Sequence, residues 1–220
     1  MSCTGVILAG GGATRFGGRP KGLEMVAGER IIDRVARALR MVTDELLLVA
    51  NAPEAAHWLP GVRTVADLRP GEGALGGLHA ALACAADDAR GDAGAATVDA
   101  GEAPDVLVVA WDMPFVSAAL LGLMHARGEE GDVDAVLPES DGSRRGVEPL
   151  CAWYSARCLP PITAALEAGD RRVIAFLDAV RVARVGIEEV RRFGDPDRLF
   201  GNVNTAEDLA RLQGMVPDVG

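Results

Sequence analysis

The sequence predicts a three-layer α/β fold with a mainly parallel sheet, and two features of its pattern lead to that expectation. Apolar runs that are too short for helices alternate along the chain with segments whose apolar residues recur at helical spacing. The runs are apolar at successive positions, which is typical of parallel strands covered on both faces. Such alternation places helices on both sides of one sheet.

The individual elements follow from these patterns and from turn and capping residues. Asp141 and Gly142 give a turn signal between two of the strands. The runs expected to form strands are Gly5–Leu8, Leu46–Val49, Val62–Ala66, Val106–Ala110, Ala135–Leu137, Leu150–Tyr154 and Val182–Val185. The segments expected to form helices are Ile31–Val42, Leu75–Ala86, Ser117–His125, Ser155–Ala168, Arg171–Val180 and Thr205–Gln213.

The domain organisation is expected to be simple. Residues 1–220 are enough for one α/β domain with a large core, and no internal repeat is visible. Residues 86–104 differ, because Asp, Gly and Ala dominate there and the apolar periodicity is lost. We expect this segment to be an exposed, mobile insertion within the single domain.

Composition excludes several classes of function. The formal net charge of −10 argues against a nucleic-acid-binding surface, which needs clustered Lys and Arg. The four cysteines form no C-x-x-C pair and the three histidines are scattered, so no zinc-site spacing appears. Free thiols, the lack of a signal-like start and the lack of a membrane-length apolar run predict a soluble cytoplasmic protein with no membrane partner.

The most informative segment runs from Val6 to Gly22. A short apolar run leads into Gly10–Gly12, and Arg15 and Lys21 follow in the same loop. Glycines allow backbone N–H groups to approach an anion closely, and successive N–H groups form an anion-binding concavity. Two added cations suit a ligand with several phosphates, so the loop predicts a nucleoside triphosphate site.

Two familiar phosphate-binding motifs are absent from this loop. A P-loop requires Ser or Thr after its lysine, whereas Lys21 is followed by Gly22. A dinucleotide fingerprint that starts at Gly10 requires glycine at its sixth position, where this chain has Arg15. The loop therefore belongs to a different class of nucleotide-binding protein.

Polar residues that follow the expected strands are candidates for the same site. Asp112 falls just after the strand Val106–Ala110, while Asn51 and Asp67 follow the second and third strands. Ligands of parallel α/β sheets bind beyond the carboxyl ends of the strands, so these side chains should meet the glycine loop. A carboxylate facing phosphates there is a natural Mg²⁺ ligand.

Four ordered blocks resemble one family. Leu8–Lys21 is similar to the signature L-A-G-G-x-x-x-R-x-G-x-x-K, with one more residue before the lysine, and Asp67–Leu78 is similar to D-x-x-x-G-x-G-P-L-x-G-I. Trp111–Phe115 is similar to C-D-M-P-F, and Asn202–Leu209 to N-x-N-T-P-E-D-L. The blocks occur in family order over nearly the whole chain. At these residues the chain resembles the MobA-type molybdenum cofactor guanylyltransferases.

The resemblance implies a Rossmann-like nucleotidyltransferase fold and a Mg²⁺-dependent reaction. GMP would pass from GTP to molybdopterin, free or molybdenum-bound, with release of pyrophosphate; a cofactor carrier or acceptor apoenzymes are the further partners it suggests. The implied catalytic residues are Arg15, Lys21 and Asp112, with Asp112 as the metal ligand. The implied nucleotide-binding residues are Leu8, Ala9, Gly10, Gly11, Lys21, Asn51, Asp67 and Asp112. The implied acceptor-binding residues are Gly76, Glu148, Asn202 and Asn204.

The departures of this chain from the family pattern include three exchanges near the expected site. Ala74 replaces the proline of the G-P-L segment, Trp111 replaces a cysteine, and Glu148 replaces the glutamine of Q-P-L. The exchange at Glu148 concerns the acceptor side and therefore the identity of the acceptor.

Other functions stay open at this stage. Related cytidylyltransferases read L-A-A-G where this chain has Gly10, which favours a purine but leaves CTP as an alternative. Another phosphorylated acceptor, such as a sugar 1-phosphate, would use the same chemistry. A non-catalytic nucleotide-binding module that delivers cofactor is the alternative of a different class.

Overall fold

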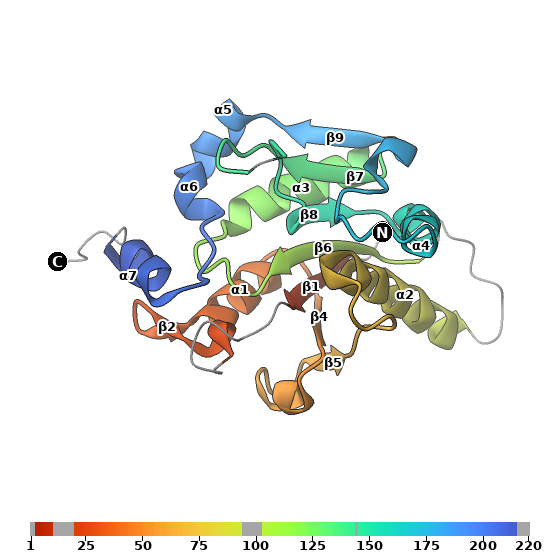
Figure 1. The fold of residues 1–220 in the computed structure, drawn as a ribbon. Coiled ribbons are helices and arrows are strands. Elements are labelled where there is room, and N and C mark those ends of the chain that lie inside the picture. The colour runs from red at the N-terminus through yellow and green to blue at the C-terminus, as the bar shows by residue number, and fades with distance from the viewer. Residues whose placement is uncertain (1–2, 11–19, 94–102, 144, 215–220) are drawn as a thin grey trace.

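The fold is built on one seven-stranded sheet with the strand order β5-β4-β1-β6-β8-β7-β9 (Figure 1). It is taken from a computed structural model that describes residues 3–10, 20–93, 103–143 and 145–214. The strands are β1 Cys3–Ala9, β4 Glu45–Ala50, β5 Arg63–Val65, β6 Asp105–Ala110, β7 Ala135–Pro138, β8 Cys151–Tyr154 and β9 Val182–Val185. The expected α/β fold with a mainly parallel sheet is confirmed, and every expected strand is present.

Strand β8 is the exception to the parallel arrangement. It pairs antiparallel with both β6 and β7, whereas β1, β4, β5 and β6 pair parallel with one another, as do β7 and β9. Cys151, the first residue of β8, is paired with Val109 near the end of β6. The residues that precede β8 therefore lie at the same edge of the sheet as the residues that follow β1, β4 and β6.

Helices cover both faces of the sheet, which gives the expected three layers (Figure 1). Alternate side chains of β1 show this division: Ile7 packs in the core formed with α1 and α3, whereas Val6 and Leu8 pack in the core formed with α2 and α4. The helices are α1 Ile31–Arg40, α2 Gly73–Ala93, α3 Ala118–Glu130, α4 Leu159–Glu167, α5 Ile187–Val190, α6 Pro196–Leu199 and α7 Ala206–Gly214.

Short elements that the sequence analysis did not expect connect these helices and strands. Besides α5 and α6 they include a hairpin of β2 Met25–Val26 and β3 Glu29–Arg30. Its turn has positive φ angles of 49° at Ala27 and 80° at Gly28, the combination that a type I′ hairpin turn requires. The 3₁₀ helices are η2 Lys21–Leu23, η3 Pro53–His57, η4 Ala156–Cys158, η5 Leu177–Ala179 and η6 Arg191–Phe193.

Two expectations about local structure were wrong. Arg171–Val180 is not a helix: only η5 forms there, and the segment starts with Asp170 accepting hydrogen bonds from the backbone and side chain of Arg172. Such local bonds compete with helix formation. The segment 86–104 is not an exposed insertion throughout, because α2 continues to Ala93 and the side chains of Ala86 and Ala103 are buried. Residues 94–102 lie outside the described part of the chain.

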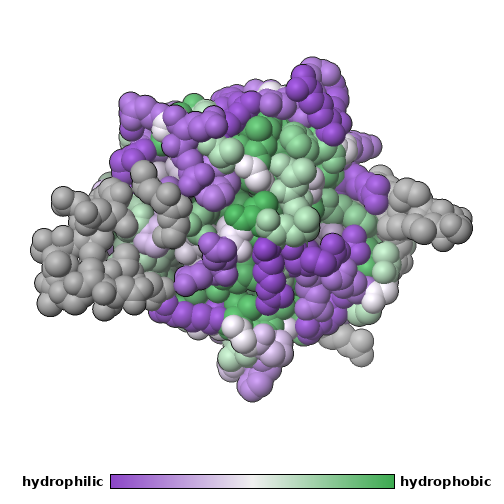
Figure 2. All heavy atoms as spheres, turned by 180° about the vertical axis from the view of Figure 1, so that it is seen from behind, coloured by the Kyte–Doolittle hydropathy of each residue, from purple (hydrophilic) through white to green (hydrophobic). Residues whose placement is uncertain are grey.

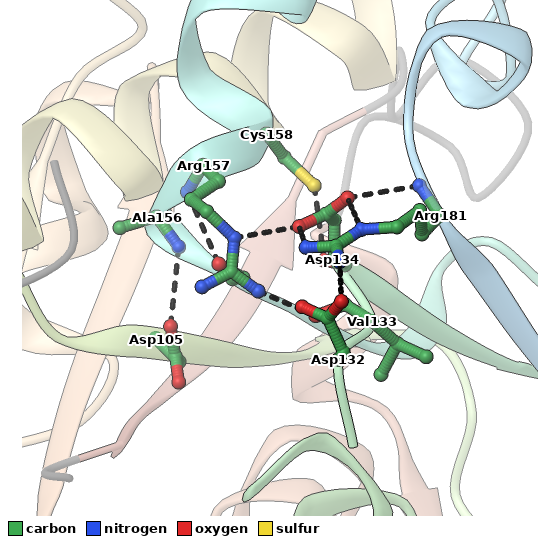
Figure 3. A network of polar contacts seen from close by, with 9 residues as sticks. Asp105, Asp132, Val133, Asp134, Ala156, Arg157, Cys158 and Arg181 are labelled. Carbon is green, nitrogen blue, oxygen red and sulfur yellow. Dashed lines mark hydrogen bonds and ion pairs between the residues drawn. The ribbon is translucent and has the colours of Figure 1, made fainter.

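An ionic network fixes the end of the sheet near β7 and β9 (Figure 3). The buried carboxylate of Asp134, just before β7, accepts hydrogen bonds from Arg157 Nε at 2.6 Å and from the backbone N–H of Arg181 at 2.9 Å. Burial alone would raise the pKa of Asp134, but hydrogen bonds from Arg181 and Arg157 bring that pKa well below its ordinary value. The network joins β7, β9 and η4.

The surface on the far side of the molecule has a simple distribution of hydropathy. Hydrophilic side chains cover its upper and lower parts, and hydrophobic side chains gather in a band between them (Figure 2). Among the described helices, none has the length and apolar character needed to cross a membrane.

Candidate active site

A cleft of about 470 Å³ opens at the edge of the sheet where β1, β4 and β6 end. All predicted nucleotide-contacting residues within the described ranges line it, whereas Arg15 and Gly11 lie outside those ranges. The lining residues are Leu8, Ala9, Gly10, Lys21, Val49, Ala50, Asn51, Asp67, Gly71, Gly73, Ala74, Gly77, Ala110, Trp111, Asp112 and Leu150.

Three polar side chains meet at one end of this cleft. The ammonium group of Lys21 donates to Asp112 Oδ2 at 2.5 Å and to Asn204 Oδ1 at 2.9 Å. The side chains of Lys21 and Asp112 are only 13% and 11% exposed, so their charges interact with little screening by water. Val203 N–H donates to the backbone oxygen of Asp112, which fastens the segment before α7 to the loop after β6.

Aromatic packing holds Lys21 in this position. Lys21 begins the 3₁₀ helix η2, whose next residue, Gly22, lies so close to the Trp111 ring that a Cβ there would collide with it. Trp111 in turn stacks on Trp58, with ring centroids 5.1 Å apart, and its backbone N–H donates to Leu8. The tryptophan at position 111 is therefore a rigid support for the lysine, a role that the sequence analysis missed.

At the opposite side of the cleft, Asn51 and Asp67 form a reciprocal pair. Asn51 Nδ2 donates to Asp67 Oδ2 at 2.7 Å, and the Asp67 backbone N–H donates to Asn51 Oδ1 at 2.8 Å. Both residues follow parallel strands, as the sequence predicted. Because both are accessible from the cleft, their remaining donor and acceptor positions are free to bind a ligand such as a base or ribose.

A second, smaller cleft of about 260 Å³ adjoins the first, and Leu150 lines both. Its walls include Glu148, Asn202 and Arg145. Asn202 Oδ1 is buried and has no hydrogen-bond partner, so it is an acceptor that a ligand can satisfy. Burial raises the pKa of Glu148, against the opposing effect of hydrogen bonds from Ser140 and Ser143.

The predicted acceptor residues are thus only partly brought together. Glu148 and Asn202 share the second cleft, and Asn204 lies at the Lys21–Asp112 pair. Gly76 lines neither cleft, and its Cβ position faces Glu72 and the backbone oxygen of Arg69 instead. No pattern in the sequence indicated Leu150 as the residue between the two clefts.

The donor set at Asp112 fits a divalent cation. Carboxylate and amide oxygens from Asp112 and Asn204 already converge on one cationic group, the ammonium of Lys21. Within the described ranges, no group of three or more His, Cys, Asp and Glu residues could hold a metal alone. Mg²⁺ does not require such a group, since it uses one or two carboxylates and completes its shell with phosphates and water.

A mainly parallel sheet with a cleft at its carboxyl edge, and a carboxylate–lysine pair at the end of that cleft, is the arrangement expected of an α/β nucleotidyltransferase. Residues 5–182 match the model of the MobA-like NTP transferase domain, and the chain belongs to this family. The resemblance inferred from the four sequence blocks is confirmed.

Relatives of known name extend the likeness over the full chain. The molybdenum cofactor guanylyltransferase of Desulfosudis oleivorans is 34% identical over 97% of this chain and 95% of its own length. The probable molybdenum cofactor guanylyltransferase of Pelotomaculum thermopropionicum is 37% identical over 98% of this chain and 94% of its own.

Solved structures agree with this fold. Molybdopterin-guanine dinucleotide biosynthesis protein A of Archaeoglobus fulgidus superposes with a TM-score of 0.74 at 26% identity, over 96% of this chain and 97% of its own. Rv0371C of Mycobacterium tuberculosis, solved in complex with manganese, has a TM-score of 0.64 at 19% identity, over 98% of this chain and 100% of its own.

Proposed function

We propose that this protein transfers GMP from GTP to molybdopterin and releases pyrophosphate. The near-full-length identity to molybdenum cofactor guanylyltransferases supports the substrates. The single observation that supports the chemistry is the convergence of Lys21, Asp112 and Asn204 at the end of the cleft. This arrangement places fixed charges where a triphosphate would be held.

The nucleotide would occupy the larger cleft. Its phosphates would lie against the glycine loop that follows β1, with Lys21 and Arg15 binding their charges. Asn51 and Asp67 would bind the base and ribose at the opposite side. A Cβ at Gly10 would have no atom of the described residues within 4 Å, which favours space for a purine beside this residue.

Asp112 is proposed to hold Mg²⁺, with Asn204 as a further oxygen donor. When bound, the ion would neutralise phosphate charge. Lys21 is then free to bind phosphate oxygens, because its present partners would be shared with a second cation. The manganese in the M. tuberculosis structure belongs to a protein of the same fold and is compatible with this assignment.

The transfer step requires no basic side chain. The terminal phosphate of molybdopterin is largely a dianion at neutral pH, since the second pKa of a phosphate monoester is about 6. One of its oxygens would form a bond to the α-phosphorus of GTP as the bond from that phosphorus to the bridging oxygen breaks. Pyrophosphate leaves with that bridging oxygen, and Lys21 stabilises its charge. The chain contributes positioning and charge neutralisation.

The acceptor would lie in the smaller cleft. Glu148 and Asn202 present hydrogen-bond acceptors there, which suits a ligand that carries N–H donors, as a pterin ring does. Leu150 separates the two clefts, so acceptor and nucleotide would meet near Asp112. We do not assign an acceptor role to Gly76, which lines neither cleft.

The experiment that tests this proposal is a substrate panel. Purified protein is incubated with Mg²⁺, freshly released molybdopterin and each of GTP, CTP, ATP and UTP, and both pyrophosphate and the dinucleotide are measured. We expect turnover with GTP alone. Turnover with CTP would contradict the choice of base, and GTP binding without turnover would favour another acceptor or a delivery module.

A Gly10→Ala variant tests the base separately. The added methyl group meets no atom of residues 3–10, 20–93, 103–143 and 145–214, so the fold should be retained, while the space for a purine becomes smaller. We expect kcat/KM for GTP to fall by about tenfold with little change in melting temperature. An unchanged preference for GTP over CTP would show that Gly10 does not select the base.

A further inference from the structure

A third cleft lies between α1, the start of α3 and α6. It shares no lining residue with the two clefts described above. Its volume is about 330 Å³, and its walls carry the arginines Arg34, Arg37 and Arg198. We propose that this cleft binds a small anion with a phosphate group. The inference does not depend on the proposed function.

The arginines are held in place by an aromatic ring. The guanidinium carbons of Arg34 and Arg198 lie 5.1 and 4.7 Å from the centroid of the Phe115 ring, which is 9% exposed. Arg34 Nε also donates to the backbone oxygen of Pro114 at 2.8 Å. Guanidinium groups fixed in this way lose little conformational freedom when they bind a ligand.

Positive charge in this cleft is only partly neutralised. Glu29 pairs with Arg37 at 3.0 Å and with Arg34 at 3.5 Å. Arg198 forms no ion pair with any carboxylate in the described part of the chain, and its buried Nε has no hydrogen-bond partner. Asp195 also lines the cleft, but its carboxylate accepts the backbone N–H of Asp197 as a helix cap.

The three cations affect one another. Burial lowers the pKa of Arg34, and the charges of Arg37 and Arg198 lower it further against the opposing effect of Glu29. Like charges held close together in a protein cost free energy unless an anion lies between them. The cluster is therefore better suited to a bound anion than to an empty cleft.

The beginning of α3 adds donors to the same cleft. Ser117 caps this helix by accepting from Leu120 N–H, and both Ser117 and Ala118 line the cleft. Backbone N–H groups in the first turn of a helix have no partner within the helix, and the helix dipole favours anions there. Arginine forks together with such N–H groups match the several oxygens of a phosphate, which makes phosphate the ligand of choice.

Residue-resolved ¹H–¹⁵N NMR of the full chain tests the proposal, because it separates this cleft from the cleft at Lys21. The protein is titrated with inorganic phosphate and, separately, with glycerol 3-phosphate. We expect saturable shifts at the Ala118 amide and at the Nε–H groups of Arg34 and Arg198. A response to only one compound identifies whether the free ion or a monoester is preferred.

Variants make the assignment specific. Arg198→Met keeps an apolar side chain over Phe115 and should weaken binding at this cleft by about tenfold, as loss of a charge-assisted hydrogen bond predicts. Arg37→Met is a second variant, whose 59% exposed side chain can be replaced without loss of the core. Exposed Arg192, which is outside the lining, gives the matched control Arg192→Met and should leave affinity unchanged.

Two results would overturn the proposal. One is a set of phosphate-induced shifts confined to residues that line the Lys21 cleft, such as Gly10 and Asn51. The other is an unchanged affinity for phosphate, measured from the shift of the Ala118 amide, in both Arg198→Met and Arg37→Met, provided that their spectra show the native fold.

Discussion

Asp112, which follows β6, and Asp134, which precedes β7, are buried to nearly the same degree, at 8% and 7% exposure. Their hydrogen-bond partners differ. Both oxygens of Asp134 accept hydrogen bonds, from Arg157 and from the backbone and side chain of Arg181 (Figure 3). Asp112 accepts one side-chain bond among the described residues, from Lys21, and it lines the cleft.

This difference separates a structural carboxylate from one that can bind a ligand. At Asp134 the hydrogen-bonding capacity is used by donors from two segments, η4 and the residue before β9, and so the charge holds the fold together. At Asp112 the side-chain donor is a single lysine that itself lines the cleft, and so the charge faces any ligand bound there. Burial alone does not distinguish the two cases; the partners do.

The largest expected effect is on catalysis. Asp112→Asn should lower the rate of GMP transfer by about 10³-fold, because the position loses its charge at the phosphates, while stability changes little. Single-turnover measurement of dinucleotide formation, with melting temperature as the control, checks this. A rate within tenfold of the wild type would show that Asp112 does not hold the metal.

Asp134→Ala should reverse that pattern. Removing the carboxylate leaves Arg157 and Arg181 without their partner, so we expect a loss of about 3 kcal/mol in the free energy of unfolding. The rate of transfer, measured well below the melting temperature, should be retained. Urea denaturation gives the free energy of unfolding. A loss of the transfer rate in fully folded Asp134→Ala protein would show that Asp134 is not purely structural.

Acid should act on Asp134 in a defined direction. Its folded pKa is depressed, so its stabilisation is fully present above the unfolded value of about 3.9 and is lost as pH falls toward the folded pKa. We expect wild-type stability to fall below about pH 4 and Asp134→Asn to show a shallower fall. Parallel slopes for the two proteins in urea titrations would exclude this contribution.

A smaller effect is expected at Asn204. Asn204→Ala removes one of the two acceptors of the Lys21 ammonium group, and kcat/KM for GTP should fall by about tenfold. Steady-state kinetics at several GTP concentrations measure this. Wild-type kinetics would restrict the site to Lys21 and Asp112.

The smallest effect concerns Glu148. Burial raises its folded pKa, so its ionisation costs stability as pH rises above the ordinary value of 4.5. Glu148→Gln should therefore raise the free energy of unfolding near neutral pH by less than about 1 kcal/mol, with no gain in acid below that value. An equal gain at both pH values in denaturant titrations would point to packing as the cause.

Much of this organisation could be predicted from the sequence, because buried strands are continuous apolar runs and polar residues that follow parallel strands must meet at one edge. Asn51, Asp67 and Asp112 were predicted on that basis and do line one cleft. The reversal of β8 could not be predicted, since an apolar run has no direction. Because the direction of β8 decides at which edge of the sheet Glu148 lies, only the family resemblance indicated that Glu148 is near the site.

Other features depend on packing that no local pattern encodes. The stack of Trp58 on Trp111 behind Gly22 joins three distant segments, and none of them carries a motif for it. The helix expected at Arg171–Val180 failed for the opposite reason: a local pattern was present. Apolar residues recur there at helical spacing, but local polar bonds and tertiary packing decide the conformation.

The bond between Lys21 and Asn204 spans 183 residues of sequence, and this separation bears on how the protein is made. Chains emerge from the ribosome N-terminus first, and distant contacts form only after both ends are present. Strands β1, β4 and β6 are available early, whereas Asn204 is added only after the chain has passed β6, β7, β8 and β9. A nascent chain can therefore form the strands behind this cleft before Asn204 is available to bond Lys21.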